Sequence, residues 1–102
     1  MAKYVNINTS GTAAVELLSD SKTESGRISK IHICNKRSAA EVISVYLEKI
    51  ADASVDYYFI KGLSIPANTS LLLEDCLSFN ISLYKLKIDD FSASNDLTVI
   101  IK

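Results

Sequence analysis

Short runs of alternating apolar and polar residues recur along this chain, and they constrain its fold more than any other feature. A period of two is typical of strands with one buried face, whereas helices repeat every 3.6 residues. In residues 27–35, for example, Ile31 and Ile33 share one face while His32 and Cys34 share the other. The runs expected to form strands cover residues 3–9, 12–18, 27–35, 38–50, 55–61, 63–65, 70–74, 81–88 and 96–102. Seven to nine short strands at a spacing near 10 residues, with no helical crossovers, predict an all-β antiparallel sandwich, immunoglobulin-like or jelly-roll-like.

Residues 38–50 fit two periods at once. As a helix, Ser38 and Glu41 would form a capping box ahead of an apolar stripe at 3.6-residue spacing. As a strand, Ile43 and Val45 would lie on one face of a segment whose centre is rich in β-branched residues. We favour the strand, because strands are expected on both sides and a lone helix between them would need its own docking surface.

Two of the predicted strands, residues 70–74 and 96–102, carry apolar side chains on both faces. An outer strand of a soluble domain normally carries charge, which discourages pairing with other chains. Two explanations remain open: both segments are central strands, or neighbouring subunits cover part of their surface. The C-terminal segment is apolar enough that we expect it to be paired inside a sheet.

Length and charge narrow the function classes. The chain has 102 residues, enough for one domain covering residues 1–102 and too few for two. Eleven basic and twelve acidic residues give a net charge of −1, which leaves no surplus for nucleic-acid phosphates or anionic lipid. The N-terminus lacks the apolar segment of a signal peptide. We therefore expect a soluble protein made in the cytoplasm, with protein partners, no nucleic acid and no membrane.

Residues capable of nucleophilic or metal chemistry are few. His32 is the only histidine, and Cys34 lies two residues away on the same strand face. That spacing places their Cβ atoms roughly 6–7 Å apart, too far for a direct hydrogen bond in most rotamers. Zinc sites usually use about four Cys or His ligands, and the chain has three such residues in all, including Cys76. We expect two free thiols, no zinc site and no catalytic dyad, although a Cys34–Cys76 disulfide stays open.

Other candidate sites are better explained as ordinary structure. The acidic pairs Glu74-Asp75 and Asp89-Asp90 lack the calcium-loop pattern and are expected to be solvated turn carboxylates. The three glycines are too far apart to form a phosphate-binding loop. No residue is therefore assigned to catalysis, to a cofactor or to a metal, and we expect no cofactor.

An aromatic run, Tyr57-Tyr58-Phe59 followed by Lys61, could offer a stacking platform for a sugar or for single-stranded nucleic acid. Adjacent strand residues point to opposite faces, however, so at most alternate members could share one surface. We expect Phe59 in the core, and the tyrosines at the edge of the core or in a protein contact.

The second half of the chain resembles small virion proteins of tailed phages, especially phages of marine bacteria. The resemblance lies in residues 57–61, 65–75, 83–88 and 96–102, with residues 31–35 and 45–47 as matching earlier strands. Together these segments cover about two-thirds of the chain. What the resemblance implies is a β-sandwich component of a phage particle: a capsid decoration protein, or a part of the neck, baseplate, tail or fibre. Its motifs are strands and turns, so it supplies no site residue.

The leading hypothesis is accordingly a non-enzymatic structural protein of the virion, most simply a capsid decoration or cement protein. It would bind the major capsid protein or neighbouring virion proteins and form a homo-oligomer in the assembly. Two alternatives come from other classes: a carbohydrate-binding module at a fibre tip that uses Tyr57, Tyr58 or Tyr84, and an enzyme built on His32 and Cys34.

Overall fold

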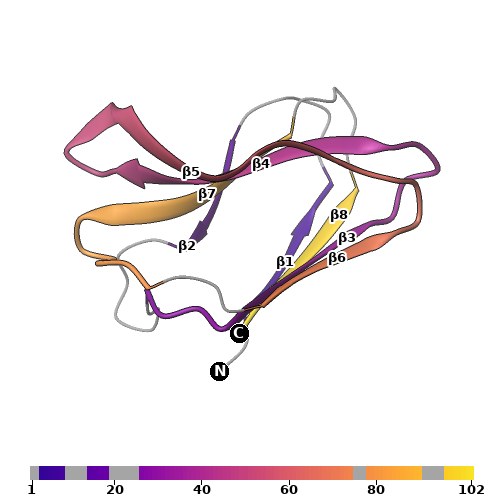
Figure 1. Ribbon diagram of the computed structural model, residues 1–102, viewed down its shortest axis with the longest axis horizontal. Helices are drawn as coiled ribbons and strands as arrows, with labels where there is room; N and C mark the ends of the chain where they lie inside the picture. Colours follow the sequence, from indigo (N-terminus) through magenta and orange to yellow (C-terminus); the bar gives the residue numbers. More distant parts are fainter. Residues whose placement is uncertain (1–2, 9–13, 19–25, 75–77, 91–95) are drawn as a thin grey trace.

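The computed structural model describes residues 3–8, 14–18, 26–74, 78–90 and 96–102, and in this part of the chain all regular structure is strand. The strands are β1 (Lys3–Ile7), β2 (Val15–Leu18), β3 (Lys30–Asn35), β4 (Glu41–Lys49), β5 (Asp52–Ile65), β6 (Ser70–Glu74), β7 (Tyr84–Asp90) and β8 (Leu97–Ile101). They form two four-stranded antiparallel sheets, with the orders β1-β8-β3-β6 and β2-β7-β4-β5 (Figure 1). The prediction of an all-β antiparallel sandwich is confirmed. Within the described ranges, no helix is long and apolar enough to cross a membrane.

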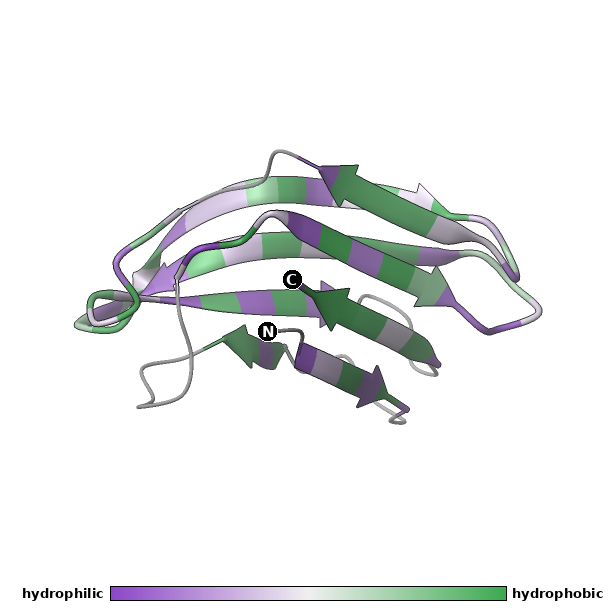
Figure 2. Cartoon of the chain, turned by 90° about the horizontal axis from the view of Figure 1, so that it is seen from below, coloured by the Kyte–Doolittle hydropathy of each residue, from purple (hydrophilic) through white to green (hydrophobic). Residues whose placement is uncertain are grey.

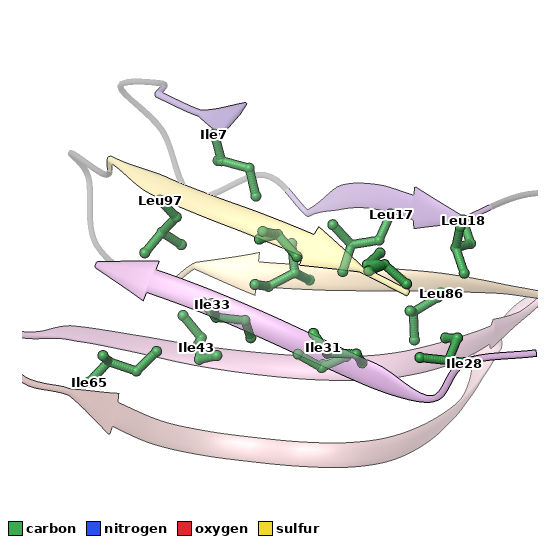
Figure 3. Packing of buried hydrophobic residues seen from close by; sticks show 14 residues of the cluster. Ile7, Leu17, Leu18, Ile28, Ile31, Ile33, Ile43, Ile65, Leu86 and Leu97 are labelled. Carbon is green, nitrogen blue, oxygen red and sulfur yellow. The ribbon is translucent and has the colours of Figure 1, made fainter. Parts of the chain in front are cut away.

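The core lies between the two sheets and is built from the inward-facing residues of both. Along several strands, such as β3, apolar and polar residues alternate, which is visible as bands of contrasting hydropathy (Figure 2). Branched aliphatic side chains from both sheets meet in the middle (Figure 3). The buried cluster consists of Ile7, Leu17, Leu18, Ile28, Ile31, Ile33, Ile43, Val45, Ile65, Leu86, Ile88, Leu97, Val99 and Ile101. Burying each of these side chains contributes roughly 1.5–3 kcal/mol, so this cluster is the main source of stability.

The ambiguous segment 38–50 contains strand β4, and the helical alternative is wrong. β4 lies between β7 and β5, so its backbone is hydrogen-bonded on both sides. Ile43 and Val45 face the core and are fully buried, whereas Ser44 and Tyr46 are buried on the opposite face. Burial on both faces explains why a period of two was hard to separate from a helical stripe.

Glu41, expected as a helix-capping residue in the helical reading, is fully buried as the first residue of β4. Its Oε2 accepts a charge-assisted hydrogen bond from Nη1 of Arg37. Glu41 thus forms an ion pair with Arg37 where the chain enters the sheet, in place of the capping box with Ser38 that the helical interpretation predicts.

The two strands with apolar residues on both faces have different positions. β8 lies between β1 and β3, so the expectation that the C-terminal strand is paired inside a sheet is confirmed. Among the strands in the described ranges, β6 pairs only with β3 and is therefore an outer strand. Of the two explanations left open by the sequence, a central position therefore applies to β8, whereas β6 is an edge strand.

Residues 55–61 and 63–65, expected as two strands, are parts of the single 14-residue strand β5. Gly62, the residue between the two expected strands, has φ 66° in the left-handed region, which glycine adopts without strain. The register against β4 shifts near this point, between Ile43 and Val45 and again between Val45 and Tyr46. The Gly62 N–H donates to Oγ of Ser44 at 3.0 Å, which holds the bulge against a buried residue on the outer face of β4.

The strand expected at residues 81–88 begins later, at Tyr84, and runs to Asp90. A turn at Asn80 delays it. The carbonyl of Asn80 accepts from the N–H groups of Leu83 and Tyr84, both at 3.0 Å, and its side-chain Oδ1 accepts from the N–H of Ser82. An asparagine side chain that bonds the backbone two residues on is a known turn former.

A buried asparagine joins the two sheets at one end of the sandwich. Asn35, the last residue of β3, is fully buried. Its Nδ2 donates to the carbonyl oxygens of Ala39 at 2.9 Å, Ile65 at 3.1 Å and Pro66 at 3.2 Å. Its Oδ1 accepts from the N–H of Arg37 at 3.0 Å. One side chain therefore fixes both the turn into β4 and the crossing from β5 to β6.

Candidate binding surfaces

An apolar row crosses the outer face of the sheet β1-β8-β3-β6. It consists of Tyr4, Ile100, His32 and Leu72, one residue from each strand. The strand registers align them directly, since Tyr4 pairs with Ile100, Ile100 with His32, and His32 with Leu72. Tyr4 is 72% exposed and Leu72 is 52% exposed, at the two ends of the row. We call these four residues the apolar row.

Polar residues flank the apolar row on both sides. On one side lie Asn6, Thr98, Cys34 and Ser70, again in register, and Oγ1 of Thr98 donates to Oδ1 of Asn6 at 2.9 Å. On the other side lie Lys102, Lys30 and Glu74. A cavity of about 250 Å³ opens here, lined by Lys30, His32, Leu72, Ile100 and Lys102. The face thus combines an apolar strip with a charged border of two lysines and one glutamate.

His32 and Cys34 lie on this outer face, both half-buried, at the positions the alternation predicted. The other residues that line the cavity with His32 are two lysines and two aliphatic residues, none of which has a side-chain carboxylate. A nucleophile pair normally needs an orienting group of that kind. Cys34 is a free cysteine, whereas Cys76 lies outside the described residues. The arrangement offers His32 as a contact residue on the apolar row.

Glu74 and Asp89 lie on different sheets, and Asp89 belongs to strand β7 and not to a turn as predicted. Glu74 is exposed at the end of β6, and Asp89 is half-buried on the outer face of β7. Asp75 and the side chain of Asp90 lie outside the described part of the chain. Among the described residues, no three His, Cys, Asp or Glu side chains gather where they could hold a metal ion.

The outer face of the other sheet, β2-β7-β4-β5, carries a chain of ion pairs. Nζ of Lys85 lies 3.0 Å from Oε1 of Glu16 and 3.2 Å from Oε2 of Glu48. Lys87 lies 3.4 Å from the same oxygen of Glu48. The hydrogen bonds to Glu16 and then to Glu48 raise the pKa of Lys85. These charges satisfy one another, so this face presents a neutralised polar surface.

Aromatic rings gather on the hairpin formed by β4 and β5, but on two different faces. On the outer face, the ring of Tyr58 lies 5.0 Å from that of Tyr46, and Nζ of Lys61 lies 5.0 Å from the centre of the Tyr58 ring. Burial, and secondarily the carboxylates of Asp89, Asp56 and Glu48, raises the pKa of Tyr46 to about 12. Tyr58 thus has two neighbours close to its ring, and it is 47% exposed.

Tyr57 faces the other way and pairs with Leu47, whose side chain packs against the core. It is nevertheless 55% exposed, because the β4–β5 hairpin projects beyond the opposite sheet (Figure 1). Its ring meets that of Tyr84 edge to face at 5.9 Å. Phe59, expected in the core, is 39% exposed, and that prediction is wrong. The bulges of β5 interrupt the alternation, so residue parity does not predict burial at this position.

Sequence reasoning missed the apolar row. Tyr4, Ile100 and Leu72 each occupy an outward position of a strand, and the signal was an apolar residue where the alternation calls for a polar one. What could not be foreseen is that these three residues and His32 share one register across four strands, because local sequence does not determine the register between distant strands.

No protein-family model matches the chain, and no curated protein sequence matches it. Among solved structures, the crystal structure of PirA is similar, with a TM-score of 0.58 over 98% of this chain and 91% of that chain. The two sequences are 13% identical over this alignment, so the likeness concerns the fold alone. It agrees with the two-sheet architecture and carries no functional residue.

Proposed function

We propose that this chain is a non-enzymatic structural subunit of a tailed-phage virion, most simply a capsid decoration protein. It acts by binding neighbouring virion proteins, without turnover. The same mode of action would suit a neck, baseplate or tail component. The proposal rests on the sequence resemblance to phage virion proteins and on the surface of the fold.

The observation that carries the binding role is the apolar row. Scattered apolar residues are normal on a protein surface, whereas a contiguous apolar strip with a polar border is typical of an interaction site. The row crosses the whole sheet, and charged residues border it on one side only. A protein partner with an apolar strip of its own would remove Tyr4 and Leu72 from water.

Mass spectrometry of particles purified from the encoding phage tests the virion role. We expect the protein in many copies per particle, and its absence from the particle would overturn the proposal. Particles made without the protein then allow an add-back assay. We expect Tyr4→Ser combined with Ile100→Ser to bind such particles at least 10-fold more weakly than the wild type, whereas Tyr58→Ser on the opposite face should bind normally.

One observation favours a second candidate, a carbohydrate-binding module: Tyr57 exposes more than half of its surface on the projecting hairpin. Tyrosine rings with a free face can stack on sugar rings, and Tyr57 has more free surface than Tyr58, which packs against Tyr46 and Lys61. A glycan array with the wild type, Tyr57→Ala and Tyr58→Ala tests this role. Binding that is lost in Tyr57→Ala alone would support it, and an array without hits would remove it.

A further inference from the structure

Four strands lie at sheet edges, and β6 differs from the other three. β2 and β5 have shifts in register, which disrupt pairing with an added strand. β1 is regular but contains Lys3 and Asn6. β6 is regular along its whole length and has three consecutive leucines at its centre, residues 71–73. Among these edges, β6 therefore has the weakest protection against pairing with another chain.

The hydrogen-bonding direction of β6 follows from its neighbours. The N–H of Asn35 donates to the carbonyl of Thr69 at 2.9 Å, so the odd-numbered residues of this segment turn their backbone groups toward β3. Antiparallel strands alternate in this respect. The N–H and C=O groups of Ser70, Leu72 and Glu74 therefore point toward the outer edge of the sheet, where no strand from the described part of the chain follows.

We propose that β6 pairs with β6 of a second copy of this chain, antiparallel and about a two-fold axis at Leu72. In this register Leu72 lies opposite the partner's Leu72, and each donates to the carbonyl of the other. Ser70 lies opposite the partner's Glu74, so a hydroxyl donor faces a carboxylate acceptor. The two four-stranded sheets become one continuous sheet.

The side chains support this register on both faces. On the outer face, the apolar row ends at Leu72 and would continue through the partner's Leu72 into the partner's row. On the inner face, Leu71 and Leu73 are only partly buried in one chain. In the dimer, Leu71 would lie opposite the partner's Leu73, and Leu73 opposite the partner's Leu71. A two-fold axis at Glu74 would instead place two carboxylates opposite each other, which is destabilising.

A pair of five-residue strands buries less area than the roughly 1,200–2,000 Å² of a stable interface. We therefore expect a dimer that forms and dissociates with protein concentration. The inference concerns the isolated protein and holds whether or not the virion role is correct.

Analytical ultracentrifugation of the full chain over a range of concentrations tests the dimer. We expect monomer at low concentration, dimer at high concentration, and at least a 10-fold weaker dimer for Leu72→Lys, which places two ammonium groups at the axis. The control is Tyr4→Lys, which adds the same charge at the far end of the same row. A wild type that stays monomeric at every concentration would overturn the proposal, as would equal weakening by both variants.

Cross-linking tests the register itself in a background with Cys34→Ser and Cys76→Ser. With the axis at Leu72, the thiols of Leu72→Cys face each other within reach of a disulfide. Those of Ser70→Cys lie about four residues apart along the strands, roughly 13 Å. We expect oxidation to give covalent dimer from Leu72→Cys and little from Ser70→Cys. Equal yields from the two variants, or more from Ser70→Cys, would contradict the register.

Discussion

The outer faces of the two sheets differ in the residues that they present at their centres. On the sheet β2-β7-β4-β5, Lys85 and Lys87 bridge Glu16 and Glu48, so charges that face outward are paired. On the sheet β1-β8-β3-β6, the corresponding central position is an apolar row, in which Leu72 is 52% exposed. Paired charges are stable when exposed to water. An exposed apolar row is not, because the free energy falls when another surface covers it. The surface proposed above for binding therefore lies on the face opposite the ion pairs, and the variants below test whether the two faces contribute differently to stability.

The largest predicted effect concerns Asn35, whose hydrogen bonds join the two sheets at one end of the sandwich. Asn35→Ala removes the donor that three buried or part-buried carbonyl groups share. Unsatisfied buried polar groups are costly, so we expect a loss of about 3 kcal/mol in the free energy of unfolding. Urea denaturation measures it. Asn6→Ala, which affects an exposed asparagine with one hydrogen bond from Thr98, should cost less than about 0.5 kcal/mol.

If Asn35→Ala were as stable as Asn6→Ala, the end of the sandwich would not depend on this side chain. The two sheets would then be held together by the apolar core alone.

A second prediction tests the charged face. Glu48 is 8% exposed and pairs with both Lys85 and Lys87, so Glu48→Ala leaves two neighbouring ammonium groups without their shared partner. We expect a loss of about 1–2 kcal/mol, reduced in 1 M salt because salt screens the remaining repulsion. The control is Glu16→Ala, whose half-exposed carboxylate pairs with Lys85 and should cost less than about 0.5 kcal/mol. Equal losses for the two variants would contradict a central role for Glu48.

A third prediction concerns alkaline pH on the same face. The folded pKa of Tyr46 is raised from 10.0 to about 12 by burial first and by Asp89, Asp56 and Glu48 next. The folded state therefore holds this proton more tightly than the unfolded state. The corresponding stability is fully present below pH 10 and is lost as the pH rises toward 12. Tyr46→Phe lacks this proton, so the stability difference between wild type and variant should move in favour of the variant between pH 10 and 12, as measured by denaturation at each pH. A constant difference would contradict the raised pKa.

The strands that sequence predicts well are those with one wet face. In β3 and β8 the buried residues alternate without a break, and the burial of Ile31, Ile33, Leu97, Val99 and Ile101 follows directly from the alternation. β4 was harder because Ser44 and Tyr46 are buried on the face that alternation assigns to water. There the sequence supports a strand through its neighbours and its β-branched residues, and not through its period.

Prediction fails where the structure depends on residues that are distant in sequence. The hydrogen bonds that Asn35 makes to Ile65 and Pro66 join residues some 30 positions apart, and nothing near Asn35 in the sequence indicates them. Residues 55–61 and 63–65 form one strand through a bulge at Gly62, whose register against β4 does not follow from the local sequence. The apolar row was missed for the same reason. Each of its residues is an isolated exception to the alternation, and only the strand register brings them together as one surface.

The smallest predicted effect on stability is on the apolar row itself. Leu72 is more than half exposed at the edge strand, so Leu72→Ser removes little buried area and should change the free energy of unfolding by less than about 0.5 kcal/mol. Its solubility should rise, because less apolar surface remains open to water. Leu73→Ser, one residue along and packed against the core, should cost about 2 kcal/mol. Urea denaturation of the two variants gives the comparison. A large loss in Leu72→Ser would mean that the apolar row stabilises the folded chain. That result would count against a row whose proposed role is to bind a partner.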